Sequence, residues 1–489
     1  MTHKILICYR NSIFERLLKI VFLKSKSIYK MKKFLAIILL ISSFSQAQFS
    51  ISGTVTSSLD TDWVVLYKTE NAKQQFVQNT TIKKDSVFMN GRYQTIGAFQ
   101  FELPADTKIG SYKINYRTNG EGFVDFIFNK ENVSFAFHPD YPEQTILFSE
   151  SKENIMYNNY LTETAAQQQK LDSLQITFIN NKQLDLSLSY KAALTVLNSI
   201  QQKYLERSKK MYVHAFIKAG LRANSSEIKP NVKEYVSHVR TTFFNTIDFS
   251  NQALRNASFL LDKITNYIFY IHYSENLETQ QKLYKKAIET VLSKIKNTIF
   301  KKNVIEFLIG KFEENKNLEM IDFLFEGYYD QLPKSLINDT FKNEKLTLLG
   351  TEVGRKAPDF SWIENGENLQ LSTLNEAKNY VLVFWSTDCS HCLKEIPELH
   401  AFLKNKKDIK VVAFAMERNK LIWTNMKTTL PNWHHVLGLN KWQNKTALTY
   451  SIVATPTYFI LDANKKIIAK PNRLKDLEAF VYNLKKVDY

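Results

Sequence analysis

Cysteine is scarce in this chain, whose 489 residues contain only Cys8, Cys389 and Cys392. A disulfide framework needs several pairs, so the class of small disulfide-stapled domains is excluded. A structural zinc site built from two cysteine pairs is disfavoured, because a single pair stands alone. Haem attachment is excluded, because Leu393 rather than histidine follows the second cysteine. The pair Cys389 and Cys392 is therefore expected to do chemistry and not to hold the fold together.

Glycine and proline are also few, at 13 and 10 residues. This composition excludes collagen-like chains and disordered chains rich in proline and glycine. With 44% apolar residues, the chain has enough hydrophobic side chains to fold into globular domains. Its length is too great for one core, so two or three domains are expected.

Apolar runs long enough to span a membrane are absent. The run FLAIILLI is about half of the ~20 residues that a spanning helix needs. It follows Met31 and two lysines and precedes SSFSQA, which ends at Ala47, and this pattern is typical of an export signal. We expect residues 1–47 to be a mis-assigned extension plus a signal peptide, with Met31 as the start. A membrane anchor and a buried helix are the alternatives. The sequence thus predicts an exported protein of the periplasm or cell envelope, not an integral membrane protein.

Dense basic runs are lacking too. The formal net charge is +17, of which residues 1–47 contribute +8, leaving a moderate excess on the remainder. No lysine- or arginine-rich run is interleaved with aromatic residues. A solvated basic surface is therefore expected, with no nucleic-acid partner.

Three regions with different hydrophobic patterns follow one another along the chain, which indicates a multidomain protein. Residues 48–150 contain short alternating runs such as FSISGTV, FVDFIF and VSFAF between glycines, which predicts an all-β module. Residues 151–346 place apolar residues at three- and four-residue spacing and predict an α-helical region. Residues 347–489 contain the continuous apolar runs YVLVFW, KVVAFAM and TYFILD with helical patterns between them, in the order β-α-β-α-β-β-α, which predicts an α/β domain.

The stretch FWSTDCSHCLKEIP, residues 384–397, joins a buried strand to a helix through a short turn. Cys389 is expected at the start of that helix, where unpaired amides create a positive field that favours a thiolate. Motifs of this type lower the thiol pKa from about 8.5 to roughly 3.5–7.5. Cys392 lies one turn further on. We therefore expect Cys389 to attack a substrate disulfide and Cys392 to resolve it.

With VATPTYFILD further on, this stretch resembles the thioredoxin superfamily, and more narrowly the exported thiol–disulfide oxidoreductases of the TlpA/ResA type. The resemblance covers roughly residues 350–489. It implies a thioredoxin-like fold, a redox disulfide Cys389–Cys392 and no bound cofactor or metal. It also implies that Glu395 assists proton transfer at Cys392, that Pro456 is a cis-proline, and that Pro456 with Thr455 frames the substrate groove. Trp385 is expected beneath the pair, at the groove or as plain core.

Three departures from that family leave the redox direction open. Thioredoxins proper carry a buried acid where Val383 stands, so proton transfer is expected to rely on Glu395 or water. Asp388 replaces the usual tryptophan before the first cysteine and should oppose a thiolate. His391, as in more oxidising relatives, should favour one. A peroxidase is disfavoured, since Leu382 stands where such an enzyme needs proline.

The sequence thus predicts a periplasmic thiol–disulfide oxidoreductase, a reductase in the favoured form, acting on client proteins with disulfides. A membrane thiol donor is expected to recycle the dithiol. One alternative is a disulfide oxidase or isomerase that uses the same site. The other is a binding or scaffold protein whose thioredoxin-like domain is accessory.

Overall fold

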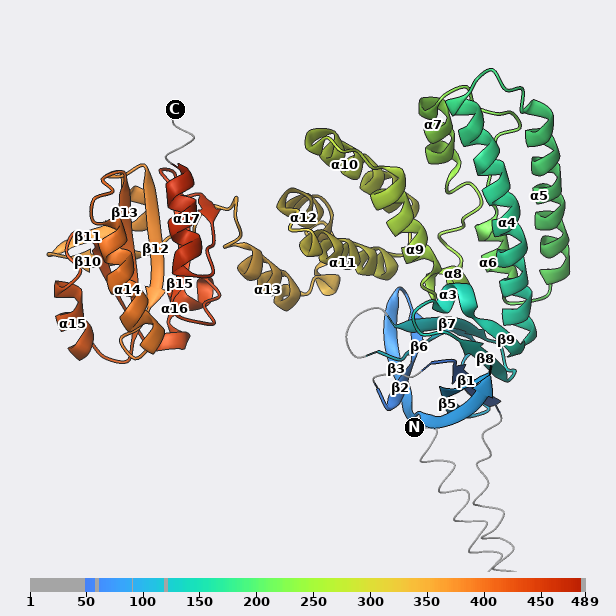
Figure 1. The fold of residues 1–489 in the computed structure, drawn as a ribbon, viewed down its shortest axis with the longest axis horizontal. Helices are drawn as coiled ribbons and strands as arrows, with labels where there is room; N and C mark the ends of the chain where they lie inside the picture. Colours follow the sequence, from blue (N-terminus) through green and yellow to red (C-terminus); the bar gives the residue numbers. More distant parts are fainter. Residues whose placement is uncertain (1–48, 58–60, 90, 118–121, 485–489) are drawn as a thin grey trace, which may run out of the picture. The chain divides into compact units, whose positions relative to one another are not determined.

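A computed structural model describes residues 49–484, apart from residues 58–60, 90 and 118–121. The predicted signal peptide and the expected start at Met31 lie outside the described residues. The chain divides into two compact units, one ending at Leu332 and one beginning at Pro333 (Figure 1). Among the described residues, no helix is both long and apolar enough to cross a membrane.

The first part of unit one is rich in sheet. One sheet has the strand order β4-β5-β1-β8-β9, and the other has the order β3-β2-β6-β7. Apolar side chains from both sheets form one core, so the sheets pack against each other. The bounds are β1 Phe49–Val55, β2 Trp63–Glu70, β3 Lys73–Thr81, β4 Lys83–Met89, β5 Arg92–Leu103, β6 Gly110–Asn115, β7 Phe123–Phe128, β8 Val133–Phe137 and β9 Leu147–Glu150, with the short helix α3 Pro142–Thr145 before β9.

Strand β8 illustrates why these segments form sheet. Its residues VSFAF alternate between buried and half-buried positions, as a strand with one core face requires. Strand β3, by contrast, has the sequence KQQFVQNTT and no fully buried residue. The alternating pattern therefore predicted β1, β7 and β8 but gave no sign of β3.

The second part of unit one is helical. Asparagine begins many of its helices: Asn231, Asn251, Asn276, Asn297 and Asn317 each accept a hydrogen bond from a first-turn amide. The bounds are α4 Lys152–Asn180, α5 Ser187–Ser208, α6 His214–Gly220, α7 Val232–Thr242, α8 Gln252–Arg255, α9 Phe259–Thr265, α10 Leu277–Lys294, α11 Thr298–Glu314 and α12 Leu318–Leu324, with π-helical turns η1 Asn266–Ile271 and η2 Phe325–Tyr329.

Helix α4 ties the helical part to the sheets. The Asn154 side chain accepts from the Ile127 amide at 2.8 Å and donates to the Ile127 carbonyl at 2.7 Å, which satisfies the free edge of β7. The buried Glu153 carboxylate accepts from the amides of Tyr212 and Val213. These buried polar contacts, being costly to break, join both parts into one unit.

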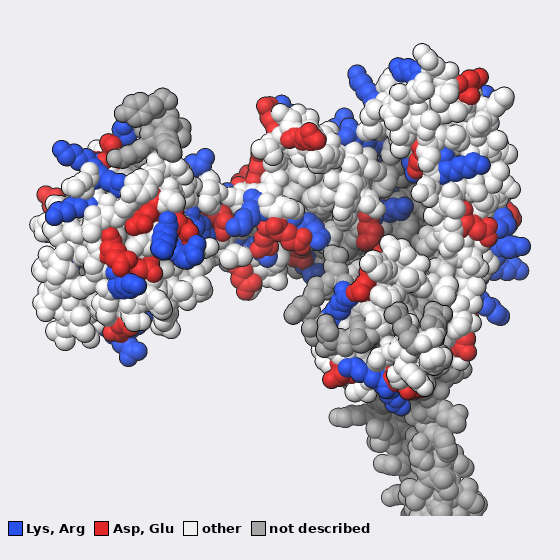
Figure 2. All heavy atoms as spheres, in the orientation of Figure 1, with Lys and Arg blue, Asp and Glu red and all other residues white. Residues whose placement is uncertain are grey.

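Charged side chains of both signs are interspersed over the face of the molecule shown in Figure 2. Several pair between helices of unit one, including Lys203 with Glu163 at 2.5 Å and Lys285 with Glu319 at 2.8 Å. Exposed pairs of this kind contribute at most about 1 kcal/mol each. The helices are therefore held mainly by their buried apolar faces.

Unit two has a five-stranded sheet with the order β14-β13-β12-β15-β16. Strands β12, β13 and β14 are parallel, while β15 and β16 run antiparallel to their neighbours. The bounds are α13 Asp339–Leu349, β10 Ser361–Glu364, β11 Glu367–Gln370, β12 Asn379–Trp385, α14 Ser390–Leu403, β13 Ile409–Glu417, α15 Leu421–Thr428, β14 His434–Leu439, α16 Lys445–Thr449, β15 Thr457–Asp462, β16 Ile467–Ala469 and α17 Leu474–Leu484, with 3-10 turns η3 Lys334–Leu336, η4 Leu371–Thr373 and η5 Lys441–Gln443.

Both faces of this sheet are buried. Val381, Val383 and Trp385 of β12 share a core with α14 and α17, whereas Tyr380, Leu382 and Phe384 share one with α16 and the β10–β11 hairpin. Burial on both faces explains why β12 is a continuous apolar run. The order β-α-β-α-β-β-α omitted the hairpin, β14 and α16. The predicted boundary between residues 346 and 347 falls inside α13.

Candidate active site: a dithiol at the start of a helix

Strand β12 delivers the two cysteines. It ends at Trp385, a short turn follows, and Cys389 is the N-cap residue of helix α14. The Cys389 sulfur accepts a hydrogen bond from the Cys392 amide at 3.3 Å. Cys389 is half-buried, Cys392 is fully buried, and both thiols are free. The pair therefore has one sulfur that a substrate can reach and one that it cannot.

The two thiols have opposite acidities. Partial burial acts to raise the pKa of the Cys389 thiol, but hydrogen bonds outweigh it, and the pKa lies below its ordinary value. Those bonds involve the Cys392 thiol, Thr455, and the amides of Cys392 and His391. Burial, with a contribution from Cys389, raises the pKa of Cys392 to about 12. Near neutral pH, Cys389 is thus the better nucleophile and Cys392 holds its proton.

The loop before β15 lies against the first cysteine. The Thr455–Pro456 peptide bond is cis, as the resemblance implied. The Cys389 thiol donates to the Thr455 carbonyl at 3.2 Å. Because β15 pairs with β12, with Thr457 opposite Phe384, the sheet itself brings this loop to the end of β12.

Glu395 has a partner that the sequence analysis missed. The hydroxyl of the buried Tyr458, on β15, donates to the Glu395 carboxylate at 2.7 Å. Burial and Glu395 raise the pKa of Tyr458 far above its ordinary range, and both cysteines add to this rise. Tyr458 therefore stays protonated as a donor within electrostatic reach of the dithiol. A tyrosine two residues after the expected cis-proline was the available signal.

The charges flanking the pair differ from the expected balance. Asp388 is exposed and forms an ion pair with Lys441, which holds the pKa of Asp388 below its ordinary value. The negative charge that was expected to oppose the thiolate is thus largely offset. The His391 side chain is exposed and has no hydrogen bond or ion pair with the residues that the structure describes. His391 acts on Cys389 through its amide.

A buried carboxylate supports the turn before the cysteines. Glu417, at the end of β13, accepts from the Thr387 amide at 2.6 Å and from the Thr387 hydroxyl at 2.9 Å. Sequence analysis missed it, although an acid closing the apolar run KVVAFAM was visible. The register places Trp385 opposite Ala415, so Glu417 lies level with the turn.

Trp385 belongs to the core and not to a groove. It is fully buried and packs in the same apolar cluster as Cys392 and Ile396. A side chain with no exposed surface cannot contact a docked substrate, so its placement among groove residues is corrected. No group of three metal-ligating side chains occurs among the described residues.

A dithiol capping a helix, with its outer sulfur against a cis-proline loop, defines the thioredoxin-fold class of thiol–disulfide oxidoreductases. Residues 352–476 match the Redoxin family. The ResA thiol-disulfide oxidoreductase of Bacillus cereus is 23% identical over 167 residues, which are 34% of this chain and 86% of that protein. The C-terminal unit is a TlpA/ResA-like member of the thioredoxin superfamily, and the chain is a thiol–disulfide oxidoreductase.

Two solved structures are each similar to a little over a quarter of the chain. A domain of a possible thiol-disulfide isomerase from Cytophaga hutchinsonii is 34% identical and covers 28% of this chain and 95% of its own, with a TM-score of 0.25. The thioredoxin domain of a thiol-disulfide oxidoreductase from Bacteroides vulgatus is 28% identical and covers 27% of this chain and 97% of its own, with a TM-score of 0.25.

Proposed function

We propose that this chain is an exported thiol–disulfide reductase that acts on protein disulfides through Cys389 and Cys392. One observation carries the proposal: the two thiols differ in exposure and in acidity. Cys389 is accessible and has a lowered pKa, whereas Cys392 is buried and has a pKa raised to about 12. This division supports one attacking and one resolving sulfur.

The reaction has two exchange steps. The Cys389 thiolate attacks one sulfur of the substrate disulfide, forms a mixed disulfide and expels the other sulfur as a thiolate. Cys392 then loses its proton and attacks the Cys389 sulfur, which releases the second substrate thiolate and closes a Cys389–Cys392 disulfide. Two electrons pass to the substrate. No bound cofactor takes part, since the dithiol supplies both electrons.

Glu395 is the proposed acceptor for the Cys392 proton. It lies on the same helix, three residues after Cys392, and is only half-buried, so it can pass a proton to solvent. Tyr458 fixes one of its oxygens. A positioned carboxylate contributes about 10²–10⁴-fold to such a transfer. Thr455 and Pro456 are the proposed groove residues, with the exposed His391 at its edge.

The reductive direction rests on what stabilises the Cys389 thiolate. A strongly stabilised thiolate makes the disulfide form oxidising. The pKa of Cys389 is lowered, but among the described residues no cationic side chain donates a hydrogen bond to its sulfur, and the His391 side chain has no hydrogen bond. We expect a reduction potential of about −250 mV or below. A potential of about −120 mV would instead identify an oxidase or isomerase.

The proposal also includes export of the chain and re-reduction of its dithiol. The pattern in residues 31–47 predicts delivery to the periplasm, where a membrane thiol donor would return electrons to the dithiol. Fractionation of cells expressing the full chain should recover it, shortened to a start near Gln48, in the periplasmic fraction. Recovery in the cytoplasm at full length would contradict export without touching the redox chemistry.

The alternative from another functional class is a scaffold protein whose redox site is accessory. It predicts that a Cys389→Ser variant restores every phenotype of a deletion strain. The proposed reductase predicts that this variant restores none of the phenotypes that depend on client thiols.

A further inference from the structure

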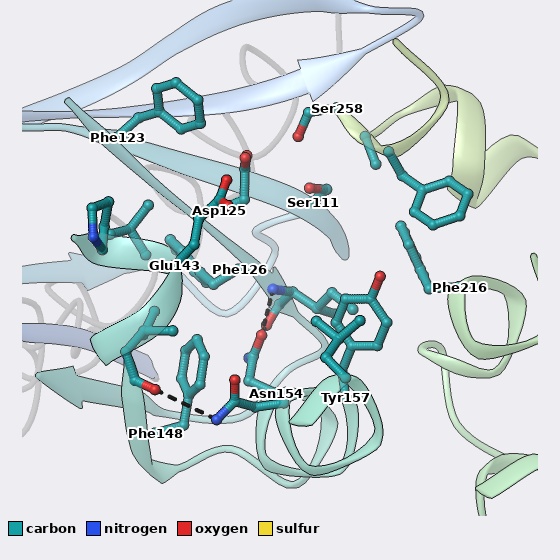
Figure 3. A pocket seen from close by; sticks show the side chains of 18 of the residues that line it. Ser111, Phe123, Asp125, Phe126, Glu143, Phe148, Asn154, Tyr157, Phe216 and Ser258 are labelled. Carbon is teal, nitrogen blue, oxygen red and sulfur yellow. Dashed lines mark hydrogen bonds between the residues drawn. The ribbon is translucent and has the colours of Figure 1, made fainter. Parts of the chain in front are cut away.

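A cavity of about 420 Å³ lies within unit one, whereas Cys389 and Cys392 belong to unit two. Strand β7, helix α3 and the first turns of α4 and α9 line it, and Figure 3 shows the side chains around it. This volume is within the range of small-molecule sites, roughly 300–1,000 Å³. None of the chemistry at the dithiol uses it.

Three carboxyl groups line this cavity, from three separate elements. Asp125 comes from β7, Glu143 from α3 and Asp262 from α9. Within the part of the chain that the structure describes, Lys113 is the one cation paired with any of them, its Nζ lying 3.4 Å from an Asp125 oxygen. Glu143 and Asp262 have no ion pair with the residues that the structure describes. With all groups ionised, the cavity has an uncompensated charge of minus two.

The carboxyl groups act on one another. Burial raises the pKa of Asp125, and Lys113 and Ser258 offset this only in part. Partial burial, with Asp125 adding to it, raises the pKa of Asp262 to about 6, and Lys113 and Lys263 act against the rise. One oxygen of Asp125 is buried without a hydrogen-bond partner in the described residues. Glu143 and Asp262 are exposed, so water also solvates them, and the unpaired Asp125 oxygen is the buried part of this charge, which an entering cation would compensate.

Aromatic rings form a further part of the wall, between other apolar and polar side chains. Phe123, Phe126, Phe148, Tyr157 and Phe216 surround the space, and the Tyr157 hydroxyl is near enough to Asp125 and Asp262 for both to raise its pKa. Ring faces together with carboxylates are what cages for organic ammonium groups use. The wall already holds one cation in this way, since Lys113 Nζ lies 3.5 Å from the centre of the Phe123 ring.

We propose that this cavity binds an organic cation, an ammonium or guanidinium group carried on an apolar body. The carboxylates of Asp125, Glu143 and Asp262 would take the charge, and the aromatic wall would take the body. A bare metal ion fits less well, because no group of three metal ligands occurs among the described residues. The cation can be a free amine or a lysine or arginine side chain of a polypeptide.

Calorimetric titration of the full chain tests this. Phenethylamine is the cationic probe, and 2-phenylethanol is its neutral match in shape. We expect the amine to bind about tenfold or more tightly than the alcohol, and to weaken as the pH falls through about 6 and Asp262 takes up a proton. Equal binding of the two probes would overturn the proposal, because the cavity would then select only apolar shape.

Two variants and two controls locate the binding. Asp262→Asn and Glu143→Gln, at positions without an ion pair to any described residue, should each weaken amine binding about fivefold or more. Asp106→Asn, on an exposed turn, and Cys389→Ser should leave it unchanged. Thermal unfolding of each variant reports whether the fold is retained. Full affinity in both cavity variants would contradict the proposal.

A third arm separates the sources of the cation. Acetylated peptides containing lysine or arginine compete with the amine if the site serves a polypeptide, and peptides that fail to compete assign it to free amines. Binding of neither the amine nor the peptides at millimolar concentration would overturn the proposal. The redox assay is unaffected in the cavity variants and is lost in Cys389→Ser, so failure here is distinguishable from failure of the reductase.

Discussion

The Tyr458 hydroxyl donates a 2.7 Å hydrogen bond to the Glu395 carboxylate, and this bond joins the strand after the cis-proline to the helix that carries both cysteines. Tyr458 is buried and Glu395 is half-buried, so the tyrosine limits how the carboxylate can turn. A base that must collect a proton from a buried thiol benefits from such restraint.

Replacing Tyr458 with phenylalanine should therefore slow the second exchange step and spare the first. The ring still packs, but Glu395 loses its donor, and we expect resolution of the mixed disulfide to fall about tenfold. Rapid-quench measurement of a single turnover separates the two steps. Glu395→Gln should give an equal or larger defect, and the double variant should be no slower than Glu395→Gln.

Tyr450→Phe is the matched control for this change. Tyr450 is also buried, but its hydroxyl donates to the Pro358 carbonyl on the other face of the sheet. It should resolve the mixed disulfide at the normal rate. If both tyrosine variants are equally slow, the defect reflects general loosening of the fold and not the positioning of Glu395.

Selective alkylation follows from the opposite pKa shifts of the two thiols. A lowered pKa gives Cys389 more thiolate at a given pH, so its iodoacetamide reaction should rise with pH at a midpoint below that of a free thiol. Cys392, with a pKa raised to about 12, should remain unlabelled through this range. Mass spectrometry of the labelled chain reads both sites, and equal labelling near neutral pH would disprove the division of roles.

Lys441 is expected to tune Cys389 through Asp388. Lys441→Met removes the ion-pair partner of Asp388 beside Cys389 and leaves Arg418 as the more distant cation, so the Cys389 pKa should rise modestly. Alkylation near neutral pH should slow accordingly. Asp388→Asn should reverse the effect in the double variant. An unchanged rate in Lys441→Met would show that the ion pair is only a surface contact.

Glu417 is expected to matter for stability. Glu417→Ala leaves the buried Thr387 amide and hydroxyl without their acceptor, which should cost about 3 kcal/mol. Tryptophan fluorescence during urea unfolding reports mainly on unit two, because Trp63 is the only one of the six tryptophans in the sequence that belongs to unit one. Glu398→Ala, at an exposed position on α14, is the control and should change stability little. A loss below about 1 kcal/mol in Glu417→Ala would mean that water replaces the carboxylate.

The predictable parts of the fold are the segments in which one feature of the sequence, such as a continuous apolar run, determines the secondary structure. Strands β12, β13 and β15 are buried on both faces and show as continuous apolar runs, and the helix start at Cys389 follows from the turn after β12. Strand β3 is polar and mostly exposed, and β14 is short and begins with two histidines, so neither gives such a signal.

The site residues that were missed share another cause. Tyr458, Glu417 and Lys441 lie outside the cysteine motif, and only strand register and loop placement bring them to it. Trp385, the last residue of β12, was expected beneath the pair, at the groove or as plain core, and its side chain packs in the core beside Cys392. Proximity along the chain says little about which face of a sheet a side chain occupies.

Trapping with the Cys392→Ala variant tests the central claim most directly. If Cys389 attacks and Cys392 resolves, the variant should accumulate mixed disulfides with client proteins through Cys389, and these should disappear when Cys389→Ser is added. Identification of the trapped partners by mass spectrometry would name the clients. An absence of mixed disulfides at neutral pH, in a variant that is folded and reaches its compartment, would contradict the account.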